Sequence, residues 1–517
     1  MKKILFSIKI ILVAALLVVS QQSCTNLDER VYSDLNGDIL FDDPDNLIYG
    51  FGLAYTNLYQ FFGHKYGVIG SEAGTDLLVV PQRGGDWYDG GEWHRYHRHE
   101  WTSTEAYVGR AWTMLFKGVN TCNRLIFTFE SLEDVDTEPA VAELRGLRAF
   151  YYLWLVDIYG NVPIVDSFDV PEDYKPATNS RQEVYDFVET ELLEVMPLLS
   201  KSTGLDYFGR INYYTAQTML AKLYINAEVY TGTPQWSKAM DAVDTVMGGG
   251  YSLAANFFSN FEEDATMSPE YIMGLHNDRL EAPAFEVHLF TLHYNLVNKY
   301  EIQDNTWNGI CAQESFYHLF DVDTNDVRRK SILFGFQYEA DGTLIEDPSY
   351  EKFDPNDVTK PTDPDGAPLN LTPEVNMLEP NCLRQAGARV AKYPFILGSD
   401  RYTSNDIPIY RYADILLMKA ELLLRQGDAG GALQYVNEVR TRSNAAPLTE
   451  MTMEILLDER ARELFAEGHR RSDMIRFGVY GNPRWEKPEQ SQSYTTIWPV
   501  PQSQIDVNQN LIQNPGY

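Results

Sequence analysis

The chain has 517 residues, and its 42 Lys and Arg against 74 Asp and Glu give a formal net charge of −32. So acidic a body repels phosphate backbones and anionic lipid faces, so we expect no nucleic-acid partner and a neutral ligand. The aromatic content of 13% exceeds what a core needs, so some Trp and Tyr must be exposed, stacked or in a groove.

The N-terminus predicts export. Three lysines surround the start of an unbroken apolar run at residues 10–19, which is too short to span a membrane and predicts a signal peptide over residues 1–23. Small residues lead to Cys24, so we expect acylation of its thiol, although Gln21 departs from the usual aliphatic residue at that place. Residues 24–43 would then be a lipidated tether holding a soluble body at a membrane surface. The alternative is an ordinary secretory signal in which Cys24 is incidental.

Three further cysteines, Cys122, Cys311 and Cys382, are far apart and form no CxxC motif. They permit at most one disulfide, so a disulfide scaffold and a cysteine zinc site are excluded. Whether any two of them pair stays open.

The first half of the chain predicts helices. Apolar residues spaced by three and four mark a helix over residues 143–159. Ser180 is the predicted N-cap of the next helix, with Glu183 completing a capping box. Helices over 212–230 and 235–247 follow, the second ended by three glycines. Helix, short turn and helix in succession are typical of a tetratricopeptide-like pair.

Residues 251–403 lack sustained periodicity and are rich in Pro, Asp, Asn and aromatic residues, with turn signals at 355–357 and 364–366. Long irregular segments of ordered proteins often carry function. Because Phe, Trp and Leu continue throughout, we interpret this segment as an inserted loop-rich subdomain rather than a linker.

Helices return in the last part of the chain. The pattern predicts a helix at 410–425 that is apolar nearly all round, a partner at 429–442, and an amphipathic helix that ends at Gly468. The predicted fold is therefore mainly α, with tetratricopeptide-like helix pairs forming a scaffold and a loop-rich inserted ligand-binding subdomain. The predicted parts are the signal peptide (1–23), the tether (24–43), an N-terminal helical-pair scaffold with an aromatic loop (44–250), the insertion (251–403) and C-terminal helical pairs (404–517).

Three clusters of charged or metal-ligating side chains have ordinary explanations. Acids and arginines over 459–473 recur at helical spacing, which indicates ion pairs on and between helices rather than the facing carboxylates of a glycosidase. His94, His97 and His99 alternate with arginines and lack a matched second cluster, which disfavours a zinc site. Residues 321–326 resemble a calcium loop but lack its glycine and closing glutamate. We predict no cofactor, with a structural calcium left open.

The sharper signal is aromatic. Residues 83–93 place two indoles and a phenol between glycine pairs that favour exposure, although at least one ring is expected to anchor the loop inward. Sugar rings pack their C–H faces on aromatic planes while nearby Asp, Asn and Arg bind the hydroxyls. A second such segment spans 300–308, whereas Trp101 and Trp112 lie on helical patterns and are predicted core. The predicted ligand-binding residues are Arg83, Asp86, Trp87, Tyr88, Trp93, Tyr300, Asn305, Trp307 and Asn308.

Several segments, in order along the mature chain, match one family's pattern. They are LRAFYYL (147–153), DIYGNVP (157–163), YRYADILL (410–417), ERAREL (459–464), EGHRRSDM (467–474), WPVP (498–501) and NLIQNPGY (510–517). These segments resemble the SusD/RagB family of outer-membrane, glycan-binding lipoproteins. Asp28 and Glu29 are similar to the acidic signal that directs such lipoproteins to the outer leaflet.

The resemblance implies four tetratricopeptide-like pairs below a variable glycan-binding face, and it places the 300–308 segment beside the N-terminal aromatic loop. It also implies a noncatalytic, cell-surface protein of a Bacteroidetes-type bacterium that delivers oligo- or polysaccharide to a SusC-like TonB-dependent transporter. Two alternatives stay open. A charged groove with few stacked aromatics would favour peptide or glycopeptide capture, and a facing carboxylate pair would favour a surface glycosidase.

Overall fold

The computed structural model describes residues 47–133, 135–347 and 367–517. The predicted signal peptide, Cys24 and the tether lie outside these residues, as do the turn signals at 355–357 and 364–366. Within the described ranges no helix combines the length and the apolar character needed to cross a membrane.

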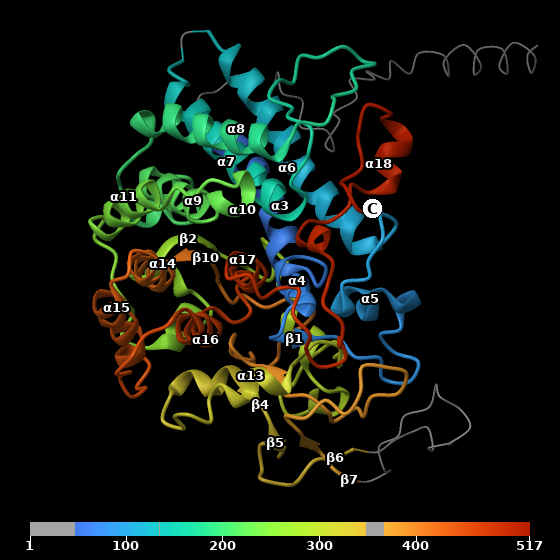
Figure 1. The fold of residues 1–517 in the computed structure, drawn as a ribbon. Helices are drawn as coiled ribbons and strands as arrows, with labels where there is room; N and C mark the ends of the chain where they lie inside the picture. The colour runs from blue at the N-terminus through green and yellow to red at the C-terminus, as the bar shows by residue number, and fades with distance from the viewer. Residues whose placement is uncertain (1–46, 134, 348–366) are drawn as a thin grey trace, which may run out of the picture. The chain divides into compact units, whose positions relative to one another are not determined.

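Helices dominate the chain up to residue 247 (Figure 1). Consecutive helices pack on one another, α6 on α7, α7 on α8, and α9 on α11. The helices of this part are α3 (Leu47–Gly63), α4 (Val68–Ser71), α5 (Glu92–Arg98), α6 (Ala106–Glu130), α7 (Glu138–Ile158), α8 (Arg181–Val195), α9 (Tyr213–Ile225), α10 (Ala227–Thr231) and α11 (Trp236–Met247).

Side-chain caps fix two of these boundaries. The Ser180 hydroxyl accepts the N–H of Glu183, while the Glu183 carboxylate accepts the N–H of Ser180 at 2.7 Å, so the predicted capping box is confirmed. At the start of α9, the Asn212 side chain accepts the N–H of Thr215 at 2.8 Å. Each bond satisfies a backbone donor that has no partner inside the helix.

Short elements replace long helices between residues 250 and 406. Each sheet of the described residues pairs two antiparallel strands: β1 with β3, β2 with β10, β4 with β9, β5 with β8, and β6 with β7. The elements are β1 (Leu78–Val79), β2 (Tyr271–Leu275), α12 (Val287–Thr291), β3 (Cys311–Ala312), α13 (Glu314–His318), β4 (Ile332–Leu333), β5 (Gly335–Phe336), β6 (Glu346–Asp347), β7 (Ala367–Pro368), β8 (Asn370–Leu371), β9 (Arg389–Val390) and β10 (Ile407–Arg411). The β1–β3 pair fastens the segment just before the N-terminal aromatic loop to the insertion.

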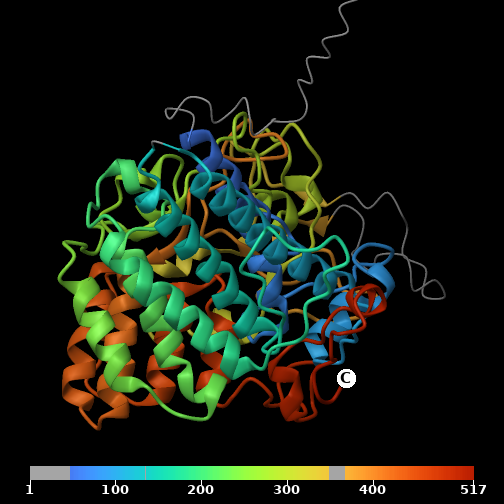
Figure 2. The same ribbon diagram turned by 90° about the horizontal axis from the view of Figure 1, so that it is seen from above.

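The C-terminal helices pack against the N-terminal ones. Figure 2 shows α11 beside α14 although many residues separate them in the chain, and the two helices are in contact. The helices are α14 (Tyr412–Arg425), α15 (Ala429–Arg442), α16 (Met453–Leu464), α17 (Arg470–Arg476) and α18 (Gln502–Val507). One boundary is corrected: Tyr410 and Arg411 belong to β10 rather than to the helix, because they pair with β2.

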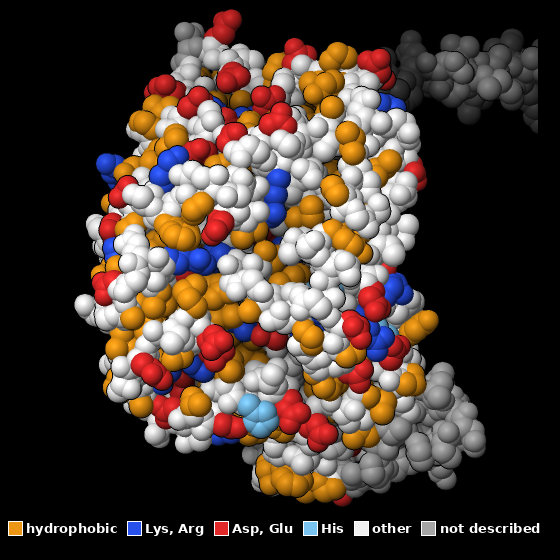
Figure 3. All heavy atoms as spheres, in the orientation of Figure 1, with side chains coloured by type: hydrophobic (Ala, Val, Ile, Leu, Met, Phe, Trp, Pro, Cys, Tyr) orange, Lys and Arg blue, Asp and Glu red, His pale blue; other side chains and the backbone are white. Residues whose placement is uncertain are grey.

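The mainly helical fold with a loop-rich insertion is confirmed. Trp101 and Trp112 are each 4% exposed, as predicted for core residues. Cys122, Cys311 and Cys382 are buried, and each is a free thiol. On the face drawn in Figure 3, acidic side chains are widely spread, and Lys and Arg form smaller groups.

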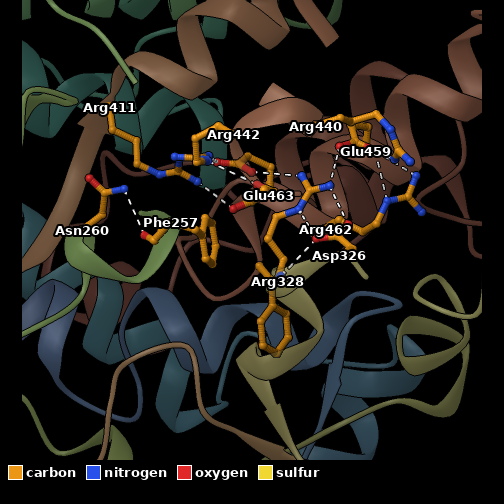
Figure 4. Close-up of polar contacts among 12 residues, drawn as sticks. Phe257, Asn260, Asp326, Arg328, Arg411, Arg440, Arg442, Glu459, Arg462 and Glu463 are labelled. Atoms are coloured by element: carbon orange, nitrogen blue, oxygen red, sulfur yellow. Dashed lines mark hydrogen bonds and ion pairs between the residues drawn. The ribbon is translucent and has the colours of Figure 1, made fainter. Parts of the chain in front are cut away.

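The charged helix α16 carries buried ion pairs (Figure 4). Arg328 lies 2.7 Å from Glu459 and 3.0 Å from Glu463, and all three side chains are 0% exposed. Burial alone would raise the pKa of Glu459, but Arg328, Arg462 and Arg440 outweigh it and lower that pKa to about 2. The expected ion pairs between helices are confirmed by Arg440 of α15 with Glu459, but the expectation of helix-surface pairs is corrected, because arginines from the insertion and from α15 surround these buried carboxylates.

Candidate functional site

The two aromatic segments meet in the structure. The indole Nε1 of Trp87 donates a 2.7 Å hydrogen bond to the backbone carbonyl of Trp307. Trp87 has a φ of 63°, a left-handed conformation that is rare for a bulky residue and that requires fixed surroundings. Its ring lies directly over Gly309, where a Cβ atom would fall 2.5 Å from Cζ2 of the indole. The sequence therefore needs glycine at 309 for the two segments to meet.

Trp93 is the inward-facing ring of the N-terminal loop. It is 1% exposed and stacks on Tyr66, with centroids 5.4 Å apart and planes 12° apart. Trp87 meets Trp93 edge to face at 6.3 Å and Phe290 at 5.1 Å. The prediction that Trp93 contacts a ligand is corrected, because no face of its ring is open; its role is to support Trp87.

Arg83 and Asn308 form a buried polar frame below the aromatic rings. Arg83 Nε donates to the carbonyl of Asn308 at 2.9 Å, and Nη2 donates to the carbonyl of Ala386 at 2.9 Å. The Asn308 side chain donates to the carbonyl of Arg384 at 3.0 Å and accepts from Arg389 at 2.7 Å. Both predicted ligand residues are at most 3% exposed, so they are corrected to positioning residues that lock the two segments together.

The remaining predicted residues differ in exposure. Tyr88 is 52% exposed, and Asp86 and Asn305 also face solvent. Trp87 and Trp307 are each partly buried, which leaves part of each indole open. Tyr300 packs on Phe395 at 4.9 Å, within the hydrophobic cluster that Trp307 also contacts.

Three cations that the sequence analysis missed surround these rings. Lys65 Nζ lies 4.9 Å from the centroid of the Trp87 ring and 5.5 Å from that of Trp307. The Arg110 guanidinium lies 4.1 Å from the centre of the Tyr66 ring, and that of Arg401 lies 5.7 Å from the Trp307 ring. A signal was present for Lys65 and Tyr66, because the glycines at 63 and 67 flank them as glycines flank the Trp87 loop.

A neutral histidine lies among these cations. Burial and the charges of Lys65, Arg110 and Arg401 lower the pKa of His64 to about 4. The buried carboxylate of Glu286 accepts the backbone N–H of Lys65 at 3.3 Å and lies 3.5 Å from the Arg401 guanidinium. The Glu286 carboxylate is therefore buried, whereas the Arg401 guanidinium that it approaches is exposed to solvent.

The histidine cluster on α5 does not converge on one point. His94 lies 2.9 Å from Glu379, His97 contacts the carbonyl of Trp485 at 2.8 Å, and His99 contacts that of Gly74 at 2.8 Å. Their partners lie in different parts of the chain, so the three imidazoles are structural.

The calcium-like segment is a turn. Asp326 caps the short helical turn that follows it and pairs with Arg328 at 2.7 Å, while Asp323 accepts the N–H of Ala446 at 2.6 Å. Metal-ligating side chains do converge elsewhere in the described residues, where atoms of Asp264, His276 and Asp406 lie within 4.8 Å of one another.

The fold and the site together define a scaffold of helix pairs that carries a surface aromatic site on irregular loops. Residues 389–495 match the family described as the SusD family, and residues 54–225 match one described as starch-binding and associating with the outer membrane. Both matches identify the chain as SusD-like, as its sequence motifs indicate.

Individual relatives agree with this assignment. The starch-binding protein SusD of Bacteroides thetaiotaomicron is 26% identical, with 81% of this chain and 80% of that protein covered. Surface glycan-binding protein A from the same species, solved in complex with laminarihexaose, superposes with a TM-score of 0.71 at 23% identity, covering 91% of this chain and 99% of the other. A SusD superfamily protein from Parabacteroides distasonis also gives 0.71, at 18% identity, covering 92% and 99%. At these identities the two structures establish the fold alone.

Proposed function

We propose that this protein captures an oligo- or polysaccharide at the cell surface without catalysis and delivers it to a SusC-like TonB-dependent transporter. The observation that carries the proposal is the joined pair of partly exposed indoles, Trp87 and Trp307. They come from two segments far apart in the chain, and a hydrogen bond and a buried polar frame hold them together.

Partly exposed indole rings are suited to binding sugar rings. A pyranose presents C–H groups on its faces and hydroxyls on its rim, so it needs apolar planes with polar groups beside them. Asp86 and Asn305 are exposed near the two indoles in the chain and can bind hydroxyls. Fixing the rings before binding reduces the ordering cost of association. The curated relative named as starch-binding supports the same ligand class for this chain.

The carboxylates of the chain's charged helix support a noncatalytic role. A glycosidase places two carboxyl groups about 5–10 Å apart across a cleft that admits the substrate. Glu459, Glu463 and Glu467 are instead buried and paired with Arg or Lys.

We also propose that the mature protein is held at the outer membrane by acylated Cys24. The description of the matching family as associating with the outer membrane supports this location, and the signal-peptide pattern supports the anchor.

Binding and folding of two tryptophan variants test the proposal. A glycan array on the soluble chain without the acyl cysteine first identifies a ligand. Trp87→Ala and Trp307→Ala should each weaken its binding by about 2 kcal/mol, roughly 30-fold, as loss of an interface anchor does. Tyr174→Ala is the matched control, because this ring is 47% exposed but lies between α7 and α8.

Calorimetric titration and thermal unfolding on the same samples separate the two explanations. If the rings are only core, truncation should cost roughly 3–5 kcal/mol of stability and leave binding intact. That result would contradict the proposal.

A further inference from the structure

Three cations lie around the rings of the aromatic site in a very acidic protein. Nζ of Lys65 makes no hydrogen bond or ion pair with any described residue, and neither does the Arg110 guanidinium. Arg401 is 53% exposed, and its carboxylate partner Glu286 is 3.5 Å away. The chain has 42 Lys and Arg against 74 Asp and Glu, and three of these cations lie around one set of rings.

Carboxylates also lie near these cations. Glu92 and Glu286 are 5% and 2% exposed and lie beneath the rings, where burial raises the pKa of both. The exposed Asp89 accepts the indole N–H of Trp93 at 3.0 Å, and the exposed Asp400 accepts the N–H of Tyr402 at 3.1 Å. The two exposed acids already accept hydrogen bonds from the protein, whereas Lys65 Nζ and the Arg110 guanidinium have no hydrogen-bonded or ion-paired partner among the described residues.

The cations lie where a sugar acid would place its charge. Lys65 and Arg401 both lie within 6 Å of the Trp307 ring centroid. A pyranose stacked on that ring carries its C5 substituent at the rim, which is a CH₂OH in a neutral hexose and a carboxylate in a uronic acid. An ammonium or guanidinium over the ring, as in Lys65 and Arg401, can bind that carboxylate through charge-assisted hydrogen bonds, which are about twice as strong as neutral ones.

The third cation connects the rings to a groove. Arg110 contacts Tyr66 and also lines an open groove of about 620 Å³ between the start of α6 and α18. Ser103, Thr104 and Gln502 give this groove hydroxyl and amide groups. Its acids are occupied, since Glu105 binds Arg95 at 2.6 Å and Asp506 accepts from Gln502 at 2.8 Å. Arg110 thus borders both the Tyr66 ring and this groove.

We propose that the ligand of this site is an acidic glycan, a uronic-acid-containing polysaccharide whose carboxylates bind Lys65, Arg401 and Arg110 while its rings stack on Trp87 and Trp307. The inference rests on the proposed glycan-binding function. It replaces the neutral ligand that the net charge alone predicts, because three cations lie around the rings of this site.

Calorimetric titration of the soluble chain with three classes of polymer tests the inference. Polygalacturonate and alginate supply uronates, laminarin and amylose supply neutral sugars, and poly-L-glutamate supplies carboxylates without sugar rings. We expect the uronates to bind most tightly and to weaken several-fold as salt rises from about 0.05 to 0.5 M, because salt screens exposed charges. Lys65→Met and Arg401→Gln should each weaken uronate binding roughly tenfold and weaken laminarin binding by a clearly smaller factor.

Lys201→Met is the matched control, because Nζ of Lys201 lies 4.6 Å from the centroid of another tyrosine ring, that of Tyr213 at the start of α9. This variant should bind uronates normally, and unchanged thermal unfolding shows that each variant is folded.

Three outcomes overturn the inference. Neutral glycans that bind more tightly than uronates would overturn it and leave the proposed function standing. Poly-L-glutamate that binds as tightly as polygalacturonate would show that charge alone, as in an acidic peptide, suffices. No binding of any polysaccharide would overturn the inference and the proposed function together.

Discussion

Glu463→Gln removes one charge from the centre of the buried ion pairs while keeping the size of the side chain. Glu463 is 0% exposed and accepts from Arg411 at 2.6 Å, from Arg328 at 3.0 Å, and from Arg442. The amide of glutamine can accept on one side only and turns an N–H₂ group toward a guanidinium. The substitution therefore leaves an uncompensated positive charge in a dry interior.

The magnitude follows from what the three arginines retain. Breaking a buried pair costs about 3–5 kcal/mol when a charge is left unpaired. Arg328 keeps Asp326 and Glu459, and Arg411 keeps Glu467, so the cost should lie near the lower end, about 3 kcal/mol.

Urea unfolding measured against a surface variant checks this value. Glu194→Gln breaks a pair with Arg145 whose carboxylate side chain is 57% exposed, and it should cost about 1 kcal/mol or less. If Glu463→Gln lowers the unfolding free energy no more than Glu194→Gln does, the buried pairs contribute nothing beyond surface pairs and the reasoning is refuted.

Three further predictions concern the stability at low pH, the acylation of Cys24 and the transporter partner. The pKa of Glu459 and that of Asp473 are lowered to about 2 in the folded chain. The stability that these carboxylates contribute is therefore present above their unfolded pKa values near 4.5 and 3.8, and it is lost as pH falls toward 2. Thermal unfolding should occur at a lower temperature at pH 3 than at pH 5, and an equal or higher temperature at pH 3 contradicts this. Mass spectrometry of the mature N-terminus should find an acylated Cys24, against which a free thiol or cleavage elsewhere would count. The protein should co-purify with a TonB-dependent barrel from native membranes in mild detergent, and recovery of monomer alone would oppose the proposed transporter.

Local signals predicted much of the scaffold, and pairing across the chain decided the rest. α15 runs over Ala429–Arg442 as predicted, because Asp428 caps it and a glycine separates it from α14. The predicted start of α14 was wrong by two residues, because an apolar run does not distinguish a buried helix from a buried strand until the partner strand β2 is known. Burial of the charged helix was missed for a similar reason, because Arg328 and Arg411 approach it from other segments.

The site shows the same limit at the level of single side chains. Glycine-flanked aromatics predicted the two segments, and the structure joins them through Trp87 and Trp307. Which ring faces inward depends on Tyr66, a residue of another loop that covers Trp93. Glycines flanking Lys65 gave a signal for that cation, but Arg401 was out of reach of sequence reasoning because it follows a segment with no periodic pattern and meets Trp307 only after folding.

Gly309 sets the position of the Trp87 ring from beneath the proposed binding surface. Since a methyl group there would overlap the indole of Trp87, any larger residue must tilt or displace the ring. Changes of ligand preference in relatives can therefore arise beneath the surface, at a backbone position, while every exposed side chain stays the same. Engineering a different sugar specificity should begin with the support of the ring as well as with the ring itself.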